Sequence, residues 1–210
     1  MKGIGVLISG GGTNLQAVMD AVDQGSIPAG INLVLSDRPG AYGLIRARKR
    51  GIPAYCINRK HFKDSGAFNR ALLKKLKEYQ VDYIVLAGYL SILSPELVEA
   101  YRNKIINVHP SLIPAFCGMG RYGDKVHKAV LEYGVKITGA TVHFVDEGAD
   151  TGPIIFQKHV EVLPDDTVET LSKRVLDAEH ELLPRAVALL VQDRIRVCGR
   201  KVIIEERGSK

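Results

Sequence analysis

Apolar runs of strand length alternate with amphipathic segments through the first hundred residues of the chain. The run Tyr83–Ala87 is almost continuously apolar, which is typical of a parallel strand buried on both faces. In Ala67–Tyr79 the apolar residues recur at helical spacing. Strands separated by helices of this length indicate right-handed crossovers, so the pattern predicts an α/β fold with a doubly wound, mostly parallel sheet. The expected strands are Ile4–Ser9, Ile31–Ser36, Ala54–Ile57 and Tyr83–Ala87, and the expected helices are Leu15–Val22, about Gly43–Arg50 and Ala67–Tyr79.

The pattern changes after residue 136. Two further runs, Ile137–Phe144 and Ile154–Val160, are expected as strands, and a turn-rich loop over 145–153 joins them. An amphipathic helix is expected from about Val168 to Val191. The chain carries no internal repeat and no low-complexity linker. We therefore expect one domain over residues 1–210, with a smaller C-terminal strand and helix portion built onto the sheet.

The composition is that of an ordinary soluble globular protein, with 46% hydrophobic and 25% charged residues. No apolar run approaches the roughly 18 residues needed to span a bilayer, and the chain enters a strand at residue 4 without a signal-peptide pattern. We therefore expect no membrane partner. The three cysteines, Cys56, Cys117 and Cys198, form no CxxC pair, which favours a reducing cytoplasm.

The net charge of +6 is moderate, and much of the basic excess lies in 74–77 and 194–201. These stretches are typical of solvated helix and tail surfaces, although attraction of anionic small molecules is an alternative. The chain has no aromatic-interleaved basic motif, helix-turn-helix or zinc signature. We therefore expect no nucleic-acid partner.

Three glycines, Gly10 to Gly12, end the first predicted strand, and a helix begins at once. Glycine lets the backbone approach a ligand closely, Thr13 or Asn14 can cap the helix, and its free N–H groups favour an anion. The dinucleotide fingerprint is absent because Leu15 occupies its third glycine position, and no Walker loop follows. The turn therefore favours a phosphate over NAD, and a tight turn without a ligand is the alternative.

A polar pair closes another predicted strand, where Asn107 and His109 follow the residues 104–106. Side chains two apart on a strand share a face, and Pro110 ends the strand because it has no N–H. Asn107 can donate to a developing oxyanion, and His109 can carry a proton. Further along the chain, Asp150 can hold and tune the histidine. The three residues together predict acyl chemistry, whereas a lone strand-end histidine would be structural.

The loop over residues 146–150 that contains Asp150 is acidic and glycine-bearing. Calcium is a rival ligand for such a loop. The loop lacks the alternating ligand spacing and the final Glu of an EF-hand, so we expect no metal.

Four segments of the chain carry a family resemblance: Ser9–Ala17, Val85–Tyr89, Asn107–Pro114 and Gly139–Ile155. At these segments the chain resembles the folate-dependent phosphoribosylglycinamide formyltransferases, a family of purine-biosynthesis enzymes. The segments span nearly the whole chain in the expected order. The last two together are specific to folate formyltransferases and their hydrolase relatives, and the first narrows the choice among these to the phosphoribosylglycinamide formyltransferases.

The resemblance implies a Rossmann-like formyltransferase fold and direct transfer of a formyl group from the co-substrate 10-formyltetrahydrofolate to the amine of glycinamide ribonucleotide (GAR). This step yields formyl-GAR in de novo purine (IMP) biosynthesis. Asn107, His109 and Asp150 would be catalytic, with Asp150 keeping His109 charged and relaying a proton through a water. The nucleotide and phosphate part would cover about 1–103 and the catalytic and folate part about 104–200. Residues 205–210 are expected to fray.

The resemblance also implies two sets of binding residues. The ribonucleotide and its phosphate would be bound by Gly12, Thr13, Asn14, Gly88, Pro110 and Glu179. The folate would be bound by Leu90, Ser91, Ile92, Leu93, Val145, Asp146, Glu147, Gly148 and Ala149. The implied partners are small molecules, and the chain would be a monomer or homodimer.

Three positions depart from the family pattern. Thr13 replaces the commoner Ser, Ser91 stands where many members have Arg, and the segment 116–127 differs from the commonest form.

Related activities share the same catalytic residues. The initiator-tRNA formyltransferases need a further nucleic-acid-binding domain, the formyl-folate hydrolases normally carry an N-terminal regulatory domain, and the nucleotide-sugar formyltransferases are longer as a rule. A silent folate- or nucleotide-binding module is the alternative from another class, but binding alone does not require the catalytic trio.

Overall fold

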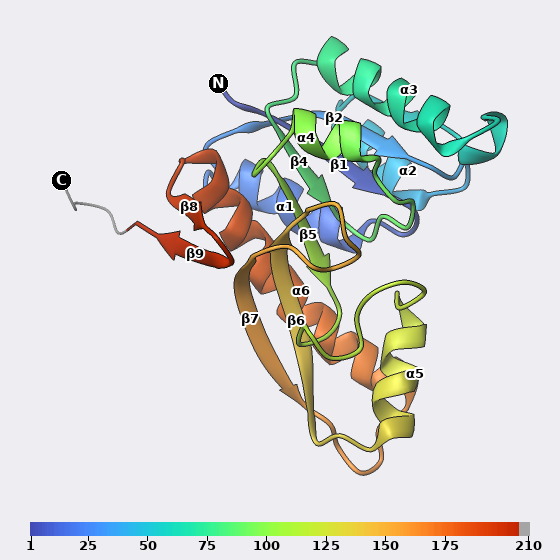
Figure 1. Cartoon of the computed structure of the whole chain (residues 1–210), viewed down its shortest axis with the longest axis vertical. Helices are drawn as coiled ribbons and strands as arrows, with labels where there is room; N and C mark the ends of the chain where they lie inside the picture. The colour runs from blue at the N-terminus through green and yellow to red at the C-terminus, as the bar shows by residue number, and fades with distance from the viewer. Residues whose placement is uncertain (206–210) are drawn as a thin grey trace.

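The computed structural model describes residues 1–205, in which a seven-stranded sheet carries helices on both faces (Figure 1). A two-stranded hairpin lies near the C-terminus. The large sheet contains β1 Gly3–Ile8, β2 Gly30–Ser36, β3 Ala54–Cys56, β4 Tyr83–Leu86, β5 Ile105–His109, β6 Ile137–Phe144 and β7 Ile154–Glu161, and the hairpin contains β8 Ile195–Cys198 and β9 Lys201–Ile204. The helices are α1 Thr13–Asp23, α2 Tyr42–Lys49, α3 Ser65–Glu78, α4 Pro95–Ala100, α5 Asp124–Tyr133 and α6 Val168–Val191, with a 3-10 turn η1 at Arg59–His61.

The strand order is β3-β2-β1-β4-β5-β6-β7, and the first five of these strands are parallel. The chain order reverses between β1 and β4, the place where open α/β sheets bind ligands beyond the carboxyl ends of their strands. Strand β6 is antiparallel to both of its neighbours, β5 and β7. Its pairing with β5 places Asn107 opposite His143 and His109 opposite Thr141. The predicted doubly wound, mostly parallel sheet is confirmed.

Two apolar cores explain why the central strands are apolar at nearly every position. Val6 and its same-face neighbours pack with α1, α2, α5 and α6, whereas Leu7 packs with α3 and α4 on the opposite face. Both side chains are fully buried. Burial on both faces removes the polar alternation that a half-exposed strand would show.

The predicted strands and helices are all present, with ends shifted by a few residues. The 3-10 turn η1, the helices α4 and α5 and the hairpin β8–β9 were not predicted. Helix α4 has six residues, begins at the Ser94 cap and Pro95, and is too short for an amphipathic period. Helix α5 begins at Asp124, within the atypical segment 116–127, and the hairpin overlaps the basic stretch 194–201 that suggested a tail.

Of the expected frayed end at 205–210, residues 206–210 lie outside the described residues. Within residues 1–205, none of the helices combines the length and the apolarity that crossing a membrane requires.

Candidate active site

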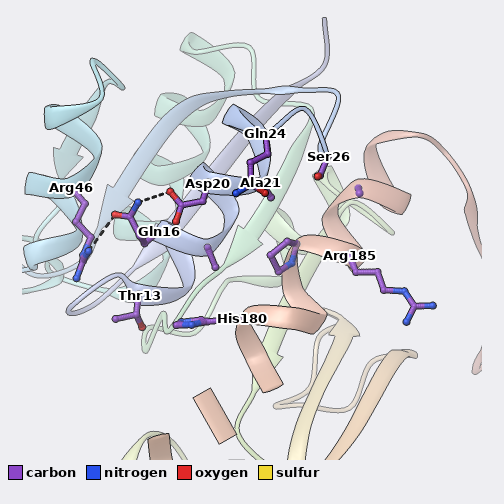
Figure 2. Close-up of a pocket in the computed structure, with 12 residues that line it drawn as sticks. Thr13, Gln16, Asp20, Ala21, Gln24, Ser26, Arg46, His180 and Arg185 are labelled. Carbon is purple, nitrogen blue, oxygen red and sulfur yellow. Dashed lines mark hydrogen bonds between the residues drawn. The ribbon is translucent and has the colours of Figure 1, made fainter. Parts of the chain in front are cut away.

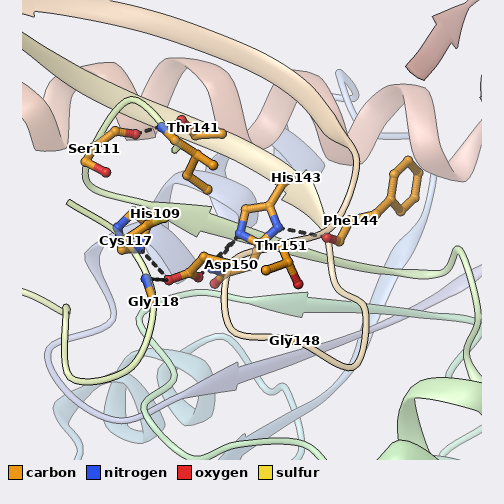
Figure 3. A network of polar contacts seen from close by, with 12 residues as sticks. His109, Ser111, Cys117, Gly118, Thr141, His143, Phe144, Gly148, Asp150 and Thr151 are labelled. Atoms are coloured by element: carbon orange, nitrogen blue, oxygen red, sulfur yellow. Dashed lines mark hydrogen bonds and ion pairs between the residues drawn. The ribbon is translucent and has the colours of Figure 1, made fainter. Parts of the chain in front are cut away.

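Strand pairing brings the predicted trio together beside a second histidine. Asn107 and His109 lie on β5, and the Asn107 amide nitrogen is 3.1 Å from Nε2 of His143 on β6. Asp150 lies between the two rings, with its carboxylate oxygens 3.5 Å from His109 Nδ1 and 3.6 Å from His143 Nε2 (Figure 3). The three predicted residues therefore converge, as side chains two apart on one strand should.

His143 is a site residue that sequence reasoning did not identify. Its Nδ1 is 2.8 Å from the carbonyl oxygen of Phe144, which can only accept, so Nδ1 carries the hydrogen. The Asn107 amide and the Asp150 carboxylate both lie near the other ring nitrogen, Nε2, which can accept from Asn107 when unprotonated and donate to Asp150 when protonated. When Nε2 accepts from Asn107, the second N–H of the amide is free. The available signal was the pair of polar residues Thr141 and His143, spaced two apart near the end of the predicted strand.

The segment after β5 covers the trio and supplies its remaining polar contacts. The backbone N–H of Gly118 donates to Asp150 at 2.9 Å, and the Phe116 carbonyl lies 3.2 Å from His109 Nε2 (Figure 3). Phe116 has a positive φ of 53°, so a left-handed turn aims these backbone groups at the site. Backbone groups of residues 116–118, part of the segment that departs from the family pattern, therefore contact two of the catalytic candidates, His109 and Asp150.

A buried hydroxyl anchors the start of that segment to the sheet. Thr141 donates to the Ser111 carbonyl at 2.7 Å and accepts from the Ile113 N–H at 3.1 Å. Gln157 on β7 adds bonds to the Ile113 carbonyl and to the Thr141 hydroxyl. Since the segment begins directly after His109, this network also limits where the histidine can move.

Opposing effects act on the charge states of the two central groups. Burial alone would raise the pKa of Asp150, but the two histidines and the Gly118 N–H outweigh it, so the pKa lies below 3.8 and the group is a carboxylate at neutral pH. Burial lowers the pKa of His109 below 6.5, and the attraction of Asp150 offsets this in part. Both ring nitrogens of His109 lie near acceptors, Nε2 near the Phe116 carbonyl and Nδ1 near the Asp150 carboxylate, and this arrangement favours the charged ring. Asp150 therefore acts on His109 in the expected direction, against the effect of burial.

The glycine turn lies at the same sheet edge and is tied to β4. Gly12 is the N-cap of α1 in the left-handed conformation, with φ 71°. A Cβ on Gly12 would lie 2.6 Å from the Cα of Gly43, so only glycine fits. Ser9 bonds through its N–H to the Gly88 carbonyl and through its hydroxyl to the Leu90 N–H. The turn and the segment after β4 therefore hold each other in place.

Among the predicted ribonucleotide residues, Thr13 is exposed at the start of α1, and Pro110 directly follows β5. Asn14 is buried and donates to Glu179 of α6 at 2.6 Å. Burial raises the pKa of Glu179 to about 7, against the opposing effect of this bond. The Asn14 side chain is thus turned toward Glu179, and a phosphate at the turn would meet backbone N–H groups.

The predicted folate residues after β4 are fixed mainly by their neighbours. The Ser91 hydroxyl donates to the buried Asp37 carboxylate at 2.6 Å. Ile92 is 60% exposed, whereas Leu93 is buried in the core under α3 and α4. Leu90 is half-buried. A ligand along this segment would therefore meet mainly backbone groups and Ile92, because the side chains of Ser91 and Leu93 already have partners.

The predicted folate residues of the second segment form a turn that ends at Asp150. Asp146 accepts from the Gly148 N–H and from the Thr151 hydroxyl. A Cβ on Gly148 would lie 2.0 Å from that hydroxyl, so a larger residue there would displace the Thr151 side chain. Asp150 itself has a φ of 59°, which aspartate tolerates better than most residues. Val145 is tied to β5, Glu147 lies 3.9 Å from Arg102, and Ala149 is half-buried.

Two cavities open near the site without including the trio. One, of about 640 Å³, runs between α1 and α6 and is lined by Thr13, Arg46 and His180, among others (Figure 2). The second, of about 460 Å³, lies behind the 145–148 turn against α4 and the β8–β9 hairpin. The trio lines neither of them, in keeping with its cover by residues 116–118.

Comparison with known proteins places this geometry in a family. A family model described as formyl transferase matches residues 2–187. The solved structure of glycinamide ribonucleotide transformylase 1 from Symbiobacterium toebii superposes with a TM-score of 0.93 at 45% identity, covering 98% of this chain and 95% of that one. A formyltetrahydrofolate deformylase structure from Pseudomonas syringae superposes with a TM-score of 0.88 at 28% identity, covering 98% of this chain and 66% of that one.

Curated relatives differ in how much of their length the chain spans. It is 45% identical to the trifunctional purine biosynthetic protein adenosine-3 of Drosophila melanogaster over 90% of this chain but only 14% of that protein. For the chloroplastic phosphoribosylglycinamide formyltransferase of Vigna unguiculata the identity is 40%, over 92% of this chain and 62% of that protein. The phosphoribosylglycinamide formyltransferase of Haemophilus influenzae is 40% identical over 94% of this chain and 91% of its own length. This chain therefore belongs to the formyl transferase family.

Proposed function

We propose that the protein transfers the formyl group of 10-formyltetrahydrofolate to the primary amine of GAR, giving formyl-GAR for purine biosynthesis. The observation that carries the proposal is the position of the Asp150 carboxylate between His109 and His143, beside the Asn107 amide. The glycine turn at the same sheet edge offers a place for the acceptor's phosphate. Two relatives that the chain spans almost entirely, the phosphoribosylglycinamide formyltransferase of Haemophilus influenzae and the glycinamide ribonucleotide transformylase 1 of Symbiobacterium toebii, support the choice of acceptor.

The nucleophile belongs to the acceptor, so no covalent enzyme intermediate is needed. The amine attacks the formyl carbon, the carbonyl oxygen becomes an oxyanion, and the bond to the folate nitrogen then breaks. The second N–H of Asn107 can donate to that oxyanion. A ring N–H of His109 can donate to the same oxyanion, and the Asp150 carboxylate favours the charged form of that ring. One proton must pass from the attacking nitrogen to the leaving nitrogen.

Asp150 is the candidate relay for that proton. Its pKa is low, and its carboxylate accepts from the Gly118 N–H. A water held by Asp150 could take the proton of the attacking amine and return it to the folate nitrogen, which requires hydrogen-bond reach and a suitable pKa. Cys117 lies beside the site, but burial raises the pKa of its thiol and its Sγ bonds to the Pro114 carbonyl. It has no part in the proposal.

Residues 12–14, Gly88, Pro110 and Glu179 are proposed to hold the ribonucleotide, and residues 90–93 and 145–149 are proposed to hold the folate, mainly through backbone groups. The co-substrate is a folate carrying a formyl group. We propose that the protein acts on small molecules in the cytoplasm, as a monomer or homodimer.

An acceptor-resolved assay tests the proposal. Purified protein is given 10-formyltetrahydrofolate with GAR, with other amines, or with no acceptor, and formylated product and formate are measured separately. The proposal expects formyl-GAR alone. Formate release without an acceptor would instead indicate the hydrolase activity named for the Pseudomonas syringae structure.

A further inference from the structure

Helix α2 donates hydrogen bonds to two backbone carbonyl groups of the glycine turn, residues 10–12. The Gly10 carbonyl accepts the Gly43 backbone N–H at 3.1 Å. The Gly11 carbonyl accepts Nε of Arg46 at 2.9 Å. Both carbonyls of the turn are therefore turned toward α2.

The orientation of these carbonyls decides where the N–H groups of the turn point. In a planar trans peptide the C=O and the following N–H point in opposite directions. The bonds to α2 therefore turn the N–H groups of Gly11 and Gly12 away from it. A left-handed residue such as Gly12, placed before a helix, groups successive N–H donors into a concave site for an anion. A Cβ added at Gly10 or Gly11 would meet no heavy atom within 4 Å, so open space adjoins the turn.

Arg46 is itself held in place by two further contacts. Its Nη1 donates to Gln16 of α1 at 3.2 Å, and its guanidinium carbon lies 5.1 Å from the ring centroid of Tyr42. Gln16 in turn donates to Asp20 at 2.9 Å (Figure 2). One side chain thus joins α2, the glycine turn and the first turns of α1. Its positive charge lies next to the turn.

We propose that Arg46 is a positioning residue for the acceptor's phosphate, acting through the Gly11 carbonyl and its own charge rather than by direct contact. This inference rests on the proposed function, in which the glycine turn binds the phosphate of GAR. Without the guanidinium the Gly11–Gly12 peptide is free to rotate, and the Gly12 N–H loses its fixed direction. Such a loss affects phosphate binding and leaves the formyl-transfer geometry on β5 and β6 unchanged.

The test compares Arg46→Ala and Arg46→Lys with Arg48→Ala. Arg48 is the matched control because it is also an arginine on α2 that donates to a backbone carbonyl, that of Ala54, on the far side from the turn. For Arg46→Ala we expect the KM for GAR to rise roughly 10-fold, the loss typical of one charge-assisted hydrogen bond. The kcat and the KM for the folate should stay within about twofold. Arg48→Ala should resemble the wild type.

The substituted side chain can also be replaced from solution. Arg46 lines the cavity of about 640 Å³, so guanidinium ion can reach the space left by Arg46→Ala (Figure 2). Millimolar guanidinium chloride should lower the KM for GAR of this variant, whereas the same concentration of sodium chloride should not. Lysine keeps the charge and one donor, so Arg46→Lys should lie between the alanine variant and the wild type.

Calorimetric titration with ribose 5-phosphate separates this inference from the proposed function. Weaker binding by folded Arg46→Ala than by wild type supports the role of Arg46, whether or not wild type formylates GAR. Equal binding by the two proteins, or equal rises in both KM values, would overturn it while leaving the proposed activity intact. If guanidinium does not lower the KM of Arg46→Ala for GAR, and Arg46→Lys binds GAR no better than Arg46→Ala, then Arg46 acts by packing alone. This result would overturn the inference as well.

Discussion

Asn14 on α1 donates a hydrogen bond to Glu179 on α6, with 2.6 Å between Nδ2 and Oε2. The bond joins the helix that follows the glycine turn to the longest helix of the fold. Glu179 is almost fully buried, and burial raises its pKa to about 7. The carboxyl therefore changes its charge close to neutral pH, beside the proposed phosphate site.

The stability of the protein should depend on the protonation of Glu179. Its folded pKa, about 7, exceeds the ordinary value of 4.5, so the folded state binds the proton more tightly. Stability is therefore lost as pH rises from about 4.5 to 7 and then levels off. The Tm of the wild type should fall relative to Glu179→Gln by on the order of 5 °C between these pH values. The exposed neighbour Glu181, replaced by Gln, is the control, and it should keep the wild-type dependence.

Asn14→Ala should act on the ribonucleotide side of the site. It leaves the buried Glu179 carboxyl without its donor and loosens the first turn of α1. We expect the KM for GAR to rise several-fold more than the KM for the folate, with kcat changed less. Steady-state kinetics with each substrate varied in turn would measure both constants, and the reverse ranking would refute a phosphate site at the turn.

Asp150→Asn should abolish most turnover while leaving substrate binding largely intact. Asparagine tolerates the φ of 59° at this position, so the backbone can stay in place while the proton acceptor is lost. The kcat should fall by ~100-fold or more, the usual range for loss of a general acid–base group. Dissociation constants measured by calorimetry should change little. If the variant kept most of its turnover, Asp150 could not be the relay.

The titration of His109 should report the balance between burial and Asp150. Burial lowers its pKa below 6.5, and Asp150 opposes that shift, so Asp150→Asn should lower the pKa further. Ring-proton NMR over pH 4.5–8 would follow this shift. His180 is the internal control, because burial also lowers its pKa but Asp177 is the carboxylate that opposes it. A His109 pKa that rises in Asp150→Asn would contradict the assignment.

Thr141→Val should destabilise the fold by about 1–3 kcal/mol, because the Ile113 N–H loses its acceptor in a buried place. Thr138→Val is a matched control on the same strand. Its hydroxyl is also buried but has no hydrogen-bond partner within residues 1–205, so valine should cost nothing there. Urea unfolding of both variants would give the difference, and equal losses would rule out the role of the Thr141 network.

Local patterns sufficed to predict the parallel part of the sheet, because two-sided burial makes strands such as Tyr83–Leu86 apolar throughout. The convergence of Asn107 with His109 also followed from strand geometry. The charge of His109 could not be predicted, since it depends on how much water the 116–118 segment excludes. The sequence did not assign His143 to the site, because its position opposite Asn107 depends on the register of β5 and β6, which local sequence patterns do not fix.

The side chains assigned to binding show a second limit. Leu93 packs into the core and Ser91 bonds to Asp37, so the side chains at two of the predicted folate positions serve the fold. Sequence motifs mark segments that lie near a ligand, but they do not separate side chains that face it from those that hold the segment. Here the packing of Leu93 against α3 and α4 and the bond from Ser91 to Asp37 make that distinction.

The residues of the site lie on two kinds of structure: the paired strands β5 and β6, and the loop that follows β6. Asn107 and His143 are placed by the ladder itself, whereas Asp150 arrives on a surface turn that leaves β6 and returns into β7. Changes confined to the exposed part of this turn therefore leave the Asn107 amide and the His143 imidazole in place. On the proposal that the turn holds the folate, the fit to the one-carbon carrier and the placing of these reacting groups depend on separate parts of the chain.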